Sequence, residues 1–364
     1  MRAALLEARG KPLTMADDID IDSPEAGEVL VRVHYCGLCH SDVTVARSEV
    51  GGVPVILGHE AAGVVETVGP GVTRVKPGDT VMLTPCPPCG HCYWCLRGEF
   101  SICVNSNAIS TATFPDGRTR LSRHGEVVYR GVGVGAFAQY VLTQESGAVP
   151  IPADTPLDVA CVIGCAVQTG VGAVINCAKV AEGDTVLVMG LGGIGMSVVQ
   201  GARLAGASRI IVSDPVGARR DAAARFGATD AIDPTATDVR GEVLRLTGVG
   251  VDFAFDAVGS SALIETGMWA TRNGGTTILV GAAPIEDTLT VTPVLMMLTE
   301  KKLKATLLGS SNSPFEIPRL IGLWRSGRLD LEGLVTNRRP LAEINEAVDD
   351  LEHGRGIRTV LAIP

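Results

Sequence analysis

The spacing of apolar positions changes twice between residues 185 and 214. Residues 185–189 form a continuous run of apolar and β-branched side chains, which predicts a buried strand. From residue 194 to residue 205 the apolar side chains recur at helical spacing, and residues 209–213 form a second apolar run. A strand, a helix and a strand in this order predict a βαβ unit of a parallel sheet.

Glycines separate the first strand of this unit from the helix. Their spacing is G-x-G-x-x-G, and a carboxylate follows about 20 residues later. Gly190 can take the tight turn, Gly192 leaves bare backbone for a pyrophosphate, and Gly195 allows the helix to pack closely on the strand. Asp214 would accept hydrogen bonds from an adenosine ribose and repel a 2′-phosphate. The unit therefore predicts a dinucleotide site at a helix N-terminus.

A membrane span is the competing interpretation of the same stretch, because it is about long and apolar enough. Gln200 and Arg203 at mid-length, the glycine spacing and the terminal Asp214 favour the βαβ unit.

The spacing of apolar and polar residues also predicts secondary structure on either side of the βαβ unit. Residues 1–35 contain strand and turn signals and no helix signal, with the alternation of a two-faced strand at 28–35. Residues 104–135 are polar and turn-rich, which predicts a surface excursion, and residues 157–177 predict a helix. Beyond the unit, strands and helices keep alternating, which predicts a doubly wound sheet. A final strand at 357–363 is expected to rejoin the first domain.

Length, charge and termini narrow the class of protein. The chain has 364 residues, enough for two domains, and a net charge of −9 without a basic run, which argues against nucleic acid as a partner. Glu7, Arg9 and Lys11 come too early for the apolar core of a signal peptide. We therefore expect a cytoplasmic protein without a membrane partner, whose ten cysteines are thiols or metal ligands rather than disulfides.

Half of the cysteines lie within 18 residues. Cys-x-x-Cys steps let one loop wrap a tetrahedral metal, and four thiolates would close the site and make it structural. The spacing allows two registers, one with Cys86, Cys89, Cys92 and Cys95, the other with Cys89, Cys92, Cys95 and Cys103. Zinc is favoured over an iron–sulfur cluster, because the trailing Cys-Pro spacing of the ferredoxin pattern is absent.

Three further potential ligands are scattered along the chain. Cys39, His59 and Cys165 offer two thiolates and one imidazole, a set that binds catalytic zinc and leaves a fourth position open. Taken singly, a buried cysteine is usually an inert small hydrophobe, and a lone histidine is more often a hydrogen-bonded structural residue. Their distance in the sequence means that spacing alone does not establish a site.

Together these motifs resemble the zinc-containing alcohol dehydrogenases of the medium-chain dehydrogenase/reductase superfamily. The resemblance extends over essentially the whole chain, through GEVLVRVHYCGLCHSD, GHEAAGVVETVGPGV, CGHCYWC, IGCAVQTG, GLGGIG and GIRTVL. It implies an α/β fold in which a doubly wound Rossmann domain, residues 167–307, is inserted in a β-rich, GroES-like catalytic domain. That catalytic domain, residues 1–166 and 308–364, would hold both zinc sites and form a cleft with the Rossmann domain.

The resemblance also implies roles for the candidate ligands and their neighbours. Cys39, His59 and Cys165 match the catalytic zinc ligands. Glu60 matches a carboxylate that can approach the metal, Asp42 the group that orients the imidazole, and Ser41 the hydroxyl that receives the alcohol proton. The structural zinc ligands that it implies belong to the second register: Cys89, Cys92, Cys95 and Cys103.

For the coenzyme, the resemblance implies NAD and one contact set. His40 and Arg358 would meet the pyrophosphate, and Thr169 would lie near the nicotinamide. Asp214 and Arg219 would hold the adenosine ribose. The turn that meets the pyrophosphate would consist of Gly190, Gly192, Gly193, Ile194 and Gly195.

The implied activity is hydride transfer between an alcohol and NAD, giving an aldehyde or ketone. Thr44 stands where many relatives carry a histidine at the outer end of the proton relay. Pro85 replaces an often bulky pocket residue, and Ser41 is one methyl smaller than the threonine of many relatives. These two changes predict a roomy pocket for bulky primary, allylic or benzylic alcohols.

Three alternatives remain at this point. A thiol-adduct formaldehyde dehydrogenase and a nicotinoprotein that keeps NAD bound lie within the enzyme class. A nucleotide-binding protein without catalysis would keep only the structural zinc, whereas the enzyme requires two zinc ions per chain. The resemblance further implies a small-molecule substrate and a homodimer or homotetramer.

Overall fold

The computed structural model describes residues 1–364 as two compact units. One consists of Met1–Ala166 and Asn312–Pro364, and the other of Val167–Ser311. The second unit is therefore an insertion in the first. The insertion expected from the sequence begins at the same residue and ends at 307 rather than 311.

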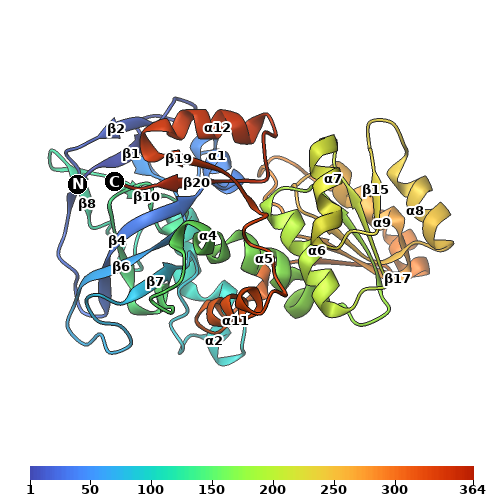
Figure 1. Ribbon diagram of the computed structural model, residues 1–364, viewed down its shortest axis with the longest axis horizontal. Helices are drawn as coiled ribbons and strands as arrows, with labels where there is room; N and C mark the ends of the chain where they lie inside the picture. The colour runs from blue at the N-terminus through green and yellow to red at the C-terminus, as the bar shows by residue number, and fades with distance from the viewer. The chain divides into compact units, whose positions relative to one another are not determined.

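The first unit is built on β-sheets (Figure 1). Its largest sheet has the order β12-β7-β6-β4-β20-β19, with β11 also paired to β4. The bounds are β4 (Glu28–Gly37), β6 (Glu60–Val68), β7 (Thr80–Leu83), β11 (Tyr140–Gln144), β12 (Ala148–Pro150), β19 (Val335–Pro340) and β20 (Arg358–Ala362). The predicted return of the final strand is confirmed, because β20 pairs antiparallel with β4.

Two smaller sheets complete this unit. One has the order β10-β5-β1-β2 and the other β3-β8-β9. Their bounds are β1 (Ala3–Leu6), β2 (Thr14–Ala16), β3 (Asp20–Ile21), β5 (Val55–Ile56), β8 (Leu121–Arg123), β9 (Glu126–Val127) and β10 (Tyr129–Arg130). The alternation read along β4 is real: Val29, Val31 and Val33 are buried in the core that these sheets share, and Arg32 is exposed.

Short helices connect the strands of the first unit. The α-helices are α1 (His40–Arg47), α2 (Tyr93–Leu96), α3 (Ala108–Thr111), α4 (Leu157–Ala160), α11 (Ser313–Arg325) and α12 (Ile344–Glu352). The 3₁₀ turns are η1 (Phe100–Ile102), η2 (Val104–Asn107), η3 (Gly131–Gly133), η4 (Glu145–Gly147), η5 (Cys161–Gly164) and η8 (Leu341–Glu343).

The second unit is the predicted Rossmann domain. Its six strands are all parallel, in the order β15-β14-β13-β16-β17-β18. The strands are β13 (Thr185–Met189), β14 (Arg209–Ser213), β15 (Asp230–Ile232), β16 (Val251–Asp256), β17 (Thr271–Leu279) and β18 (Lys302–Ala305). The helical segments are α5 (Ala166–Gly172), η6 (Ala173–Ala178), α6 (Gly193–Ala205), α7 (Gly217–Phe226), α8 (Val239–Thr247), α9 (Ser261–Ala270), α10 (Pro293–Thr299) and η7 (Leu308–Ser310).

The prediction of one helix over 157–177 is wrong. The segment is α4, then η5, then α5 and a π-helical turn, and it is interrupted at Cys165, whose backbone has φ −137° and ψ −68°. A Cβ on Gly164 would lie 2.9 Å from the Leu83 carbonyl, so the chain passes close to β7 there. Tertiary contact thus overrides the helix propensity of an alanine- and valine-rich sequence.

The prediction of a surface excursion over 104–135 is also wrong. The segment contributes β8, β9 and β10 to two sheets and buries Phe114. The guanidinium groups of Arg120 and Arg130 lie 4.9 and 3.8 Å from the Phe114 ring centroid, and Arg120 also pairs with Glu28 at 2.8 Å. Charged residues are buried here through ion pairs and cation–π contacts, which a hydropathy pattern does not reveal.

No single helix in the chain is long and apolar enough to cross a bilayer. The bent pair Leu157–Gly164 and Ala166–Ala178 meets that criterion only when its two segments are taken together.

Candidate active site

Four buried side chains converge in the first unit. The ligand atoms of Cys39, His59, Glu60 and Cys165 lie within 4.8 Å of one another. Cys39 is the N-cap of α1, His59 and Glu60 stand where β6 begins, and Cys165 occupies the break after η5. The three segments are distant in sequence, so the fold assembles this group.

Asp42 ties two of these segments together. One of its carboxylate oxygens accepts the Cys39 backbone N–H at 3.1 Å. The other accepts the Gly58 N–H at 2.9 Å and lies 3.1 Å from Nδ1 of His59. Because Nδ1 faces the carboxylate, Nε2 of the imidazole is left for a metal, as in ligating histidines generally. Burial lowers the pKa of His59, but the Asp42 carboxylate and the Cys39 sulfur outweigh it and hold the pKa well above its ordinary value.

The two carboxylate oxygens of Glu60 differ, because one has hydrogen-bond and ionic partners and the other has none. Its Oε1 accepts the Ala166 N–H at 3.1 Å and lies 3.5 Å from Nη2 of Arg358, whereas the buried Oε2 has no hydrogen-bond partner. Burial raises the pKa of Glu60 to about 7, against the opposing charge of Arg358. Arg358, expected to meet the pyrophosphate, is itself buried, and its Nη1 donates to the Leu38 carbonyl at 2.7 Å.

The thiols complete a donor set that suits zinc. The hydrogen bond from Cys165 is the largest influence that lowers the pKa of Cys39 well below its ordinary value, and the same bond raises the pKa of Cys165. Two sulfurs and one imidazole fit a catalytic zinc ion with an open position, and Glu60 Oε2 is an additional oxygen donor. Ser41 Oγ lies 3.6 Å from Cys39 Sγ, and His40 is exposed at the first position of α1.

A second group of four sulfurs forms within one loop. The Sγ atoms of Cys89, Cys92, Cys95 and Cys103 lie within 4.8 Å of one another, and Cys86 is not part of the group. Backbone N–H groups point at the sulfurs: Cys89 N lies 3.3 Å from Cys103 Sγ, and Cys92 N lies 3.3 Å from Cys89 Sγ. Four cysteine sulfurs without an open position fit a structural zinc ion.

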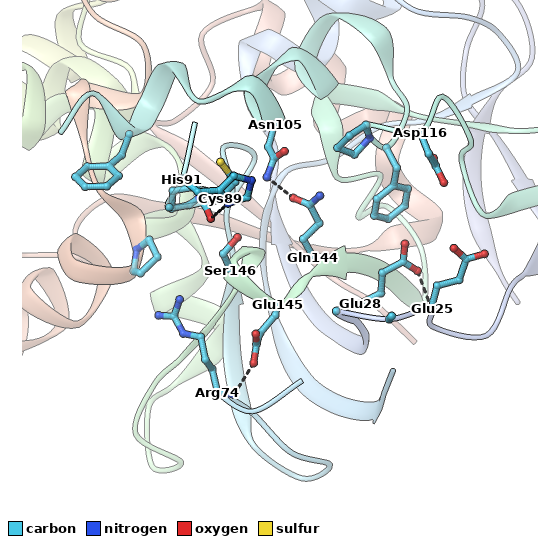
Figure 2. A pocket seen from close by; sticks show the side chains of 18 of the residues that line it. Glu25, Glu28, Arg74, Cys89, His91, Asn105, Asp116, Gln144, Glu145 and Ser146 are labelled. Carbon is cyan, nitrogen blue, oxygen red and sulfur yellow. Dashed lines mark hydrogen bonds between the residues drawn. The ribbon is translucent and has the colours of Figure 1, made fainter. Parts of the chain in front are cut away.

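The surroundings of this loop are polar. Figure 2 shows Cys89 and His91 at the edge of a pocket of about 780 Å³, where the side-chain amide of Asn105 donates to Gln144 at 2.6 Å. Cys86 is buried apart from the sulfur group, and burial raises the pKa of its thiol to about 12.

In the second unit the three glycines of the turn differ in their surroundings. Gly190 has φ +89°, which a side chain would strain. A Cβ on Gly192 would meet nothing within 4 Å, whereas one on Gly195 would lie 1.7 Å from the Gly190 carbonyl. The turn thus leaves open space at the N-terminus of α6, which begins at Gly193 and Ile194.

Asp214 closes the turn from the end of β14. It is 3 % exposed, and its carboxylate accepts the backbone N–H groups of Leu191 at 2.7 Å and Val216 at 2.8 Å. Arg219 lies in the first turn of α7, and Thr169 is buried in α5.

Sequence reasoning missed two features of the site. The backbone N–H groups of Gly58 and Ala166 hold Asp42 and Glu60, and the side chain of Arg358 reaches Glu60 from the last strand. Gly58 precedes His59 directly and has φ +91°, so its place in the Gly-His-Glu motif was the available signal. Nothing in the sequence pattern indicates the approach of Arg358.

Comparison with known proteins agrees with this geometry. Residues 25–153 match the alcohol dehydrogenase GroES-like domain family, and residues 193–323 match the zinc-binding dehydrogenase family. The S-(hydroxymethyl)glutathione dehydrogenase of Escherichia coli is 38% identical over 366 residues, 99% of each chain. An alcohol dehydrogenase zinc-binding domain protein of Burkholderia ambifaria superposes with a TM-score of 0.94 at 36% identity, covering 100% of this chain and 98% of the other. The benzyl alcohol dehydrogenase of Acinetobacter calcoaceticus superposes with a TM-score of 0.93 at 30% identity, covering 100% of this chain and 99% of the other.

The fold and the two ligand groups define a zinc-dependent oxidoreductase with a nicotinamide dinucleotide coenzyme. The chain belongs to the zinc-containing alcohol dehydrogenases of the medium-chain dehydrogenase/reductase superfamily. It is thus an enzyme that acts on small-molecule alcohols or aldehydes. The alternative of a nucleotide-binding protein without catalysis is therefore excluded.

Proposed function

We propose that the chain oxidises a bulky primary, allylic or benzylic alcohol with NAD, or reduces the matching aldehyde, at the Cys39, His59 and Cys165 group. The observation that carries this proposal is the convergence of these buried ligands within 4.8 Å beside a carboxylate oxygen without a partner. A zinc ion held by them would act as a Lewis acid that lowers the pKa of an alcohol hydroxyl toward neutrality.

The protein's own groups would hold the site and move the proton. Asp42 fixes the imidazole of His59, and Glu60 has a free oxygen that can approach the metal during ligand exchange. Ser41, next to Cys39, would receive the alcohol proton. Thr44 supplies a hydroxyl instead of an imidazole further along α1, so we propose that the proton leaves to solvent from there.

NAD is the proposed coenzyme, with His40, Thr169, Arg219, Arg358 and the turn Gly190–Gly195 among its contacts. The carboxylate of Asp214 would face a 2′-phosphate. Arg220 is not available to neutralise that phosphate, because it donates to the Asp214 carbonyl at 2.6 Å and pairs with Asp233 at 2.7 Å. We expect kcat/KM with NAD to exceed that with NADP, and equal values would contradict this assignment.

The substrate class rests on the pocket residues and the relatives. Pro85 is buried and follows β7 by two positions, and Ser41 is small. A relative at 30% identity acts on benzyl alcohol, which fits a roomy apolar pocket. The second candidate is a formaldehyde–thiol adduct, because the relative at 38% identity is an S-(hydroxymethyl)glutathione dehydrogenase.

One assay separates these candidates. The zinc-loaded enzyme is given ethanol, hexanol, benzyl alcohol, or formaldehyde with glutathione, each with NAD. The proposal expects the highest kcat/KM for benzyl alcohol or hexanol. If the glutathione adduct is best the second candidate is correct, and if ethanol is best the roomy pocket is wrong. Purified enzyme carrying stoichiometric NAD would identify the nicotinoprotein variant.

We further propose a homodimer or homotetramer joined through the second unit. Its edge strand β18 has all four residues exposed, and unpaired edges tend to pair with another chain. The neighbouring helix α10 exposes Val294, Met297 and Leu298 at 52%, 68% and 68%. A second copy would cover this apolar face, and the molar mass from light scattering tests it.

The cytoplasm is the proposed compartment. All ten cysteines are free of disulfides, and nine of them either belong to the two ligand groups or are buried elsewhere in the first unit. Reduced thiols of this kind fit a reducing compartment. Localisation of the tagged chain by fractionation tests this.

A further inference from the structure

A cavity of about 240 Å³ lies between α1 and α12 in the first unit, and Asp42 is the one residue with a role assigned above that lines it. α1 and α12 form its long sides, and the loop Gly10–Leu13 forms its rim. Eight of the side chains that line it are apolar: Pro12, Leu13, Leu38, Val43, Ala46, Leu57, Phe137 and Val348. Six are polar or charged: Lys11, Asp42, Arg47, Asn345, Asp349 and Glu352. Two of the apolar residues are close sequence neighbours of the candidate ligands, since Leu38 precedes Cys39 and Leu57 stands two residues before His59.

Hydrogen bonds hold the walls of this cavity in place. The Gly10 N–H donates to the Ala46 carbonyl at 3.0 Å, which joins the rim loop to α1. The Asn345 side chain accepts the Leu13 N–H at 3.0 Å and donates to the Leu13 carbonyl at 2.9 Å, which joins the same loop to α12. A cavity whose walls are fixed before binding costs a ligand little ordering free energy.

The polar side chains that line the cavity have partners, apart from Lys11, which is exposed to solvent. Arg47 pairs with Glu352 across the rim, and Asp349 pairs with Arg355. The oxygens of Asp42 accept hydrogen bonds from Cys39, Gly58 and His59. A charged ligand would find no unpaired counter-charge in the interior, so the chemistry of the lining selects an uncharged molecule.

The volume sets the size of that molecule. It corresponds to roughly eight water molecules at about 30 Å³ each, and the apolar part of the lining offers them few hydrogen bonds. Weakly held water is displaced favourably by an apolar group. Since an apolar cavity of about 150 Å³ can hold benzene, this one has room for a ring with a substituent.

We propose that this cavity binds one small, uncharged, apolar molecule of about the size of a monosubstituted benzene. The ligand would contact Leu38, Val43 and Leu57, and so would rest against the segments that carry Cys39, Asp42 and His59. The cavity is a separate site from the alcohol pocket, and the proposal holds whichever substrate the enzyme prefers.

The polar pocket of Figure 2 carries no comparable inference. It is larger, at about 780 Å³, but its carboxylates already have partners, either the Arg120 side chain or backbone N–H groups. The single side chain of Arg120 forms ion pairs with three of them: Glu25, Glu28 and Asp116. Nε and Nη1 of Arg120 have no hydrogen-bond partner, but this guanidinium lies against the Phe114 ring, so they do not indicate a ligand.

Fluorobenzene is a suitable probe, because it is uncharged, has the right size and cannot be oxidised by the enzyme. Its ¹⁹F resonance is titrated with the zinc-loaded, full-length protein. We expect saturable binding with a Kd on the order of 1 mM, typical of a ligand with so few atoms. No saturable binding up to the solubility limit of the probe would overturn the proposal.

Filling the cavity locates the probe. Val348→Phe places a ring in the space from α12, and Ala46→Leu fills it from α1 if the first variant fails to fold. Either variant should weaken binding at least tenfold at unchanged zinc content. The matched control is Ala342→Phe, at an exposed position just before α12, which should keep Kd within twofold. Unchanged binding in the filled variants would place the probe in the alcohol pocket and refute the assignment, and so would an equal loss in the control.

Discussion

The two groups of candidate metal ligands are built in opposite ways. Cys89, Cys92, Cys95 and Cys103 come from one loop of short helical turns, and two of them are only partly buried. The group around Cys39 and His59 is fully buried and draws its members from three separated segments. One site is made by a loop, and the other by the whole first unit.

The difference predicts what each metal does for the fold. Hydrogen bonds of Asp42 and packing of the core hold the buried group, so we expect its segments to stay in place when the metal is lost. The loop has little core of its own, and a metal bound there contributes folding free energy directly. Loss of metal should therefore remove activity at the first site and stability at the second.

The largest effect should come from Cys39→Ser. We expect turnover to fall at least about 1,000-fold, because loss of a thiolate weakens an open, three-ligand site. The protein should contain one zinc ion fewer, with Tm within about 2 °C of the parent. The matched control is Cys86→Ser, a buried thiol in neither group, which should keep both zinc content and turnover. Full turnover in the Cys39 variant would refute the active-site assignment.

Cys95→Ser should give the reverse pattern. We expect Tm to fall by about 5 °C or more and soluble yield to drop, since a closed site loses its folding energy. Turnover per folded, zinc-loaded molecule should stay within twofold. Differential scanning calorimetry and metal analysis on the same sample test both statements. An unchanged Tm would mean that the loop does not depend on a metal.

Asp42→Asn tests the support of the buried group without removing a ligand. An asparagine oxygen can still face His59, but its NH₂ cannot accept the Cys39 N–H. We expect zinc affinity of this site, and turnover with it, to fall 10–100-fold, as for other groups that orient metal ligands. Asp79→Asn, which affects only contacts of Asp79 with the ammonium and backbone N–H of Lys76 near the surface, is the control. If both variants behave alike, Asp42 is not a positioning residue.

The same contrast explains what could be predicted from the sequence. The cysteine-rich loop is visible from spacing, because its ligands are neighbours, although spacing left two registers open. The buried group is not, because Cys165 lies 106 residues after His59 and only the family resemblance joined them. The Rossmann strands and helices followed from periodicity, since each is buried by the regular pattern of its own residues.

The features that were not predicted from the sequence share one physical cause. The break at Cys165, the approach of Arg358 to Glu60 and the burial of Arg120 all depend on residues distant in sequence. In each case a tertiary contact outweighs the local preference, and a single sequence does not show that contact.

The smallest effect on activity should come from a change at Ser41, beside the buried group of Cys39, His59 and Cys165. Ser41→Thr keeps the hydroxyl that would receive the proton and adds one methyl beside the metal ligands. One methyl in an apolar pocket changes the discrimination between two substrates by about 1–3 kcal/mol. The ratio of kcat/KM for benzyl alcohol over ethanol should therefore fall about tenfold, while zinc content and Tm stay unchanged. Ser110→Thr, at an exposed position of α3, should leave the ratio as it is. A ratio that does not move in the Ser41 variant would show that the space beside the zinc is not set by this side chain, and that Pro85 or other residues determine it.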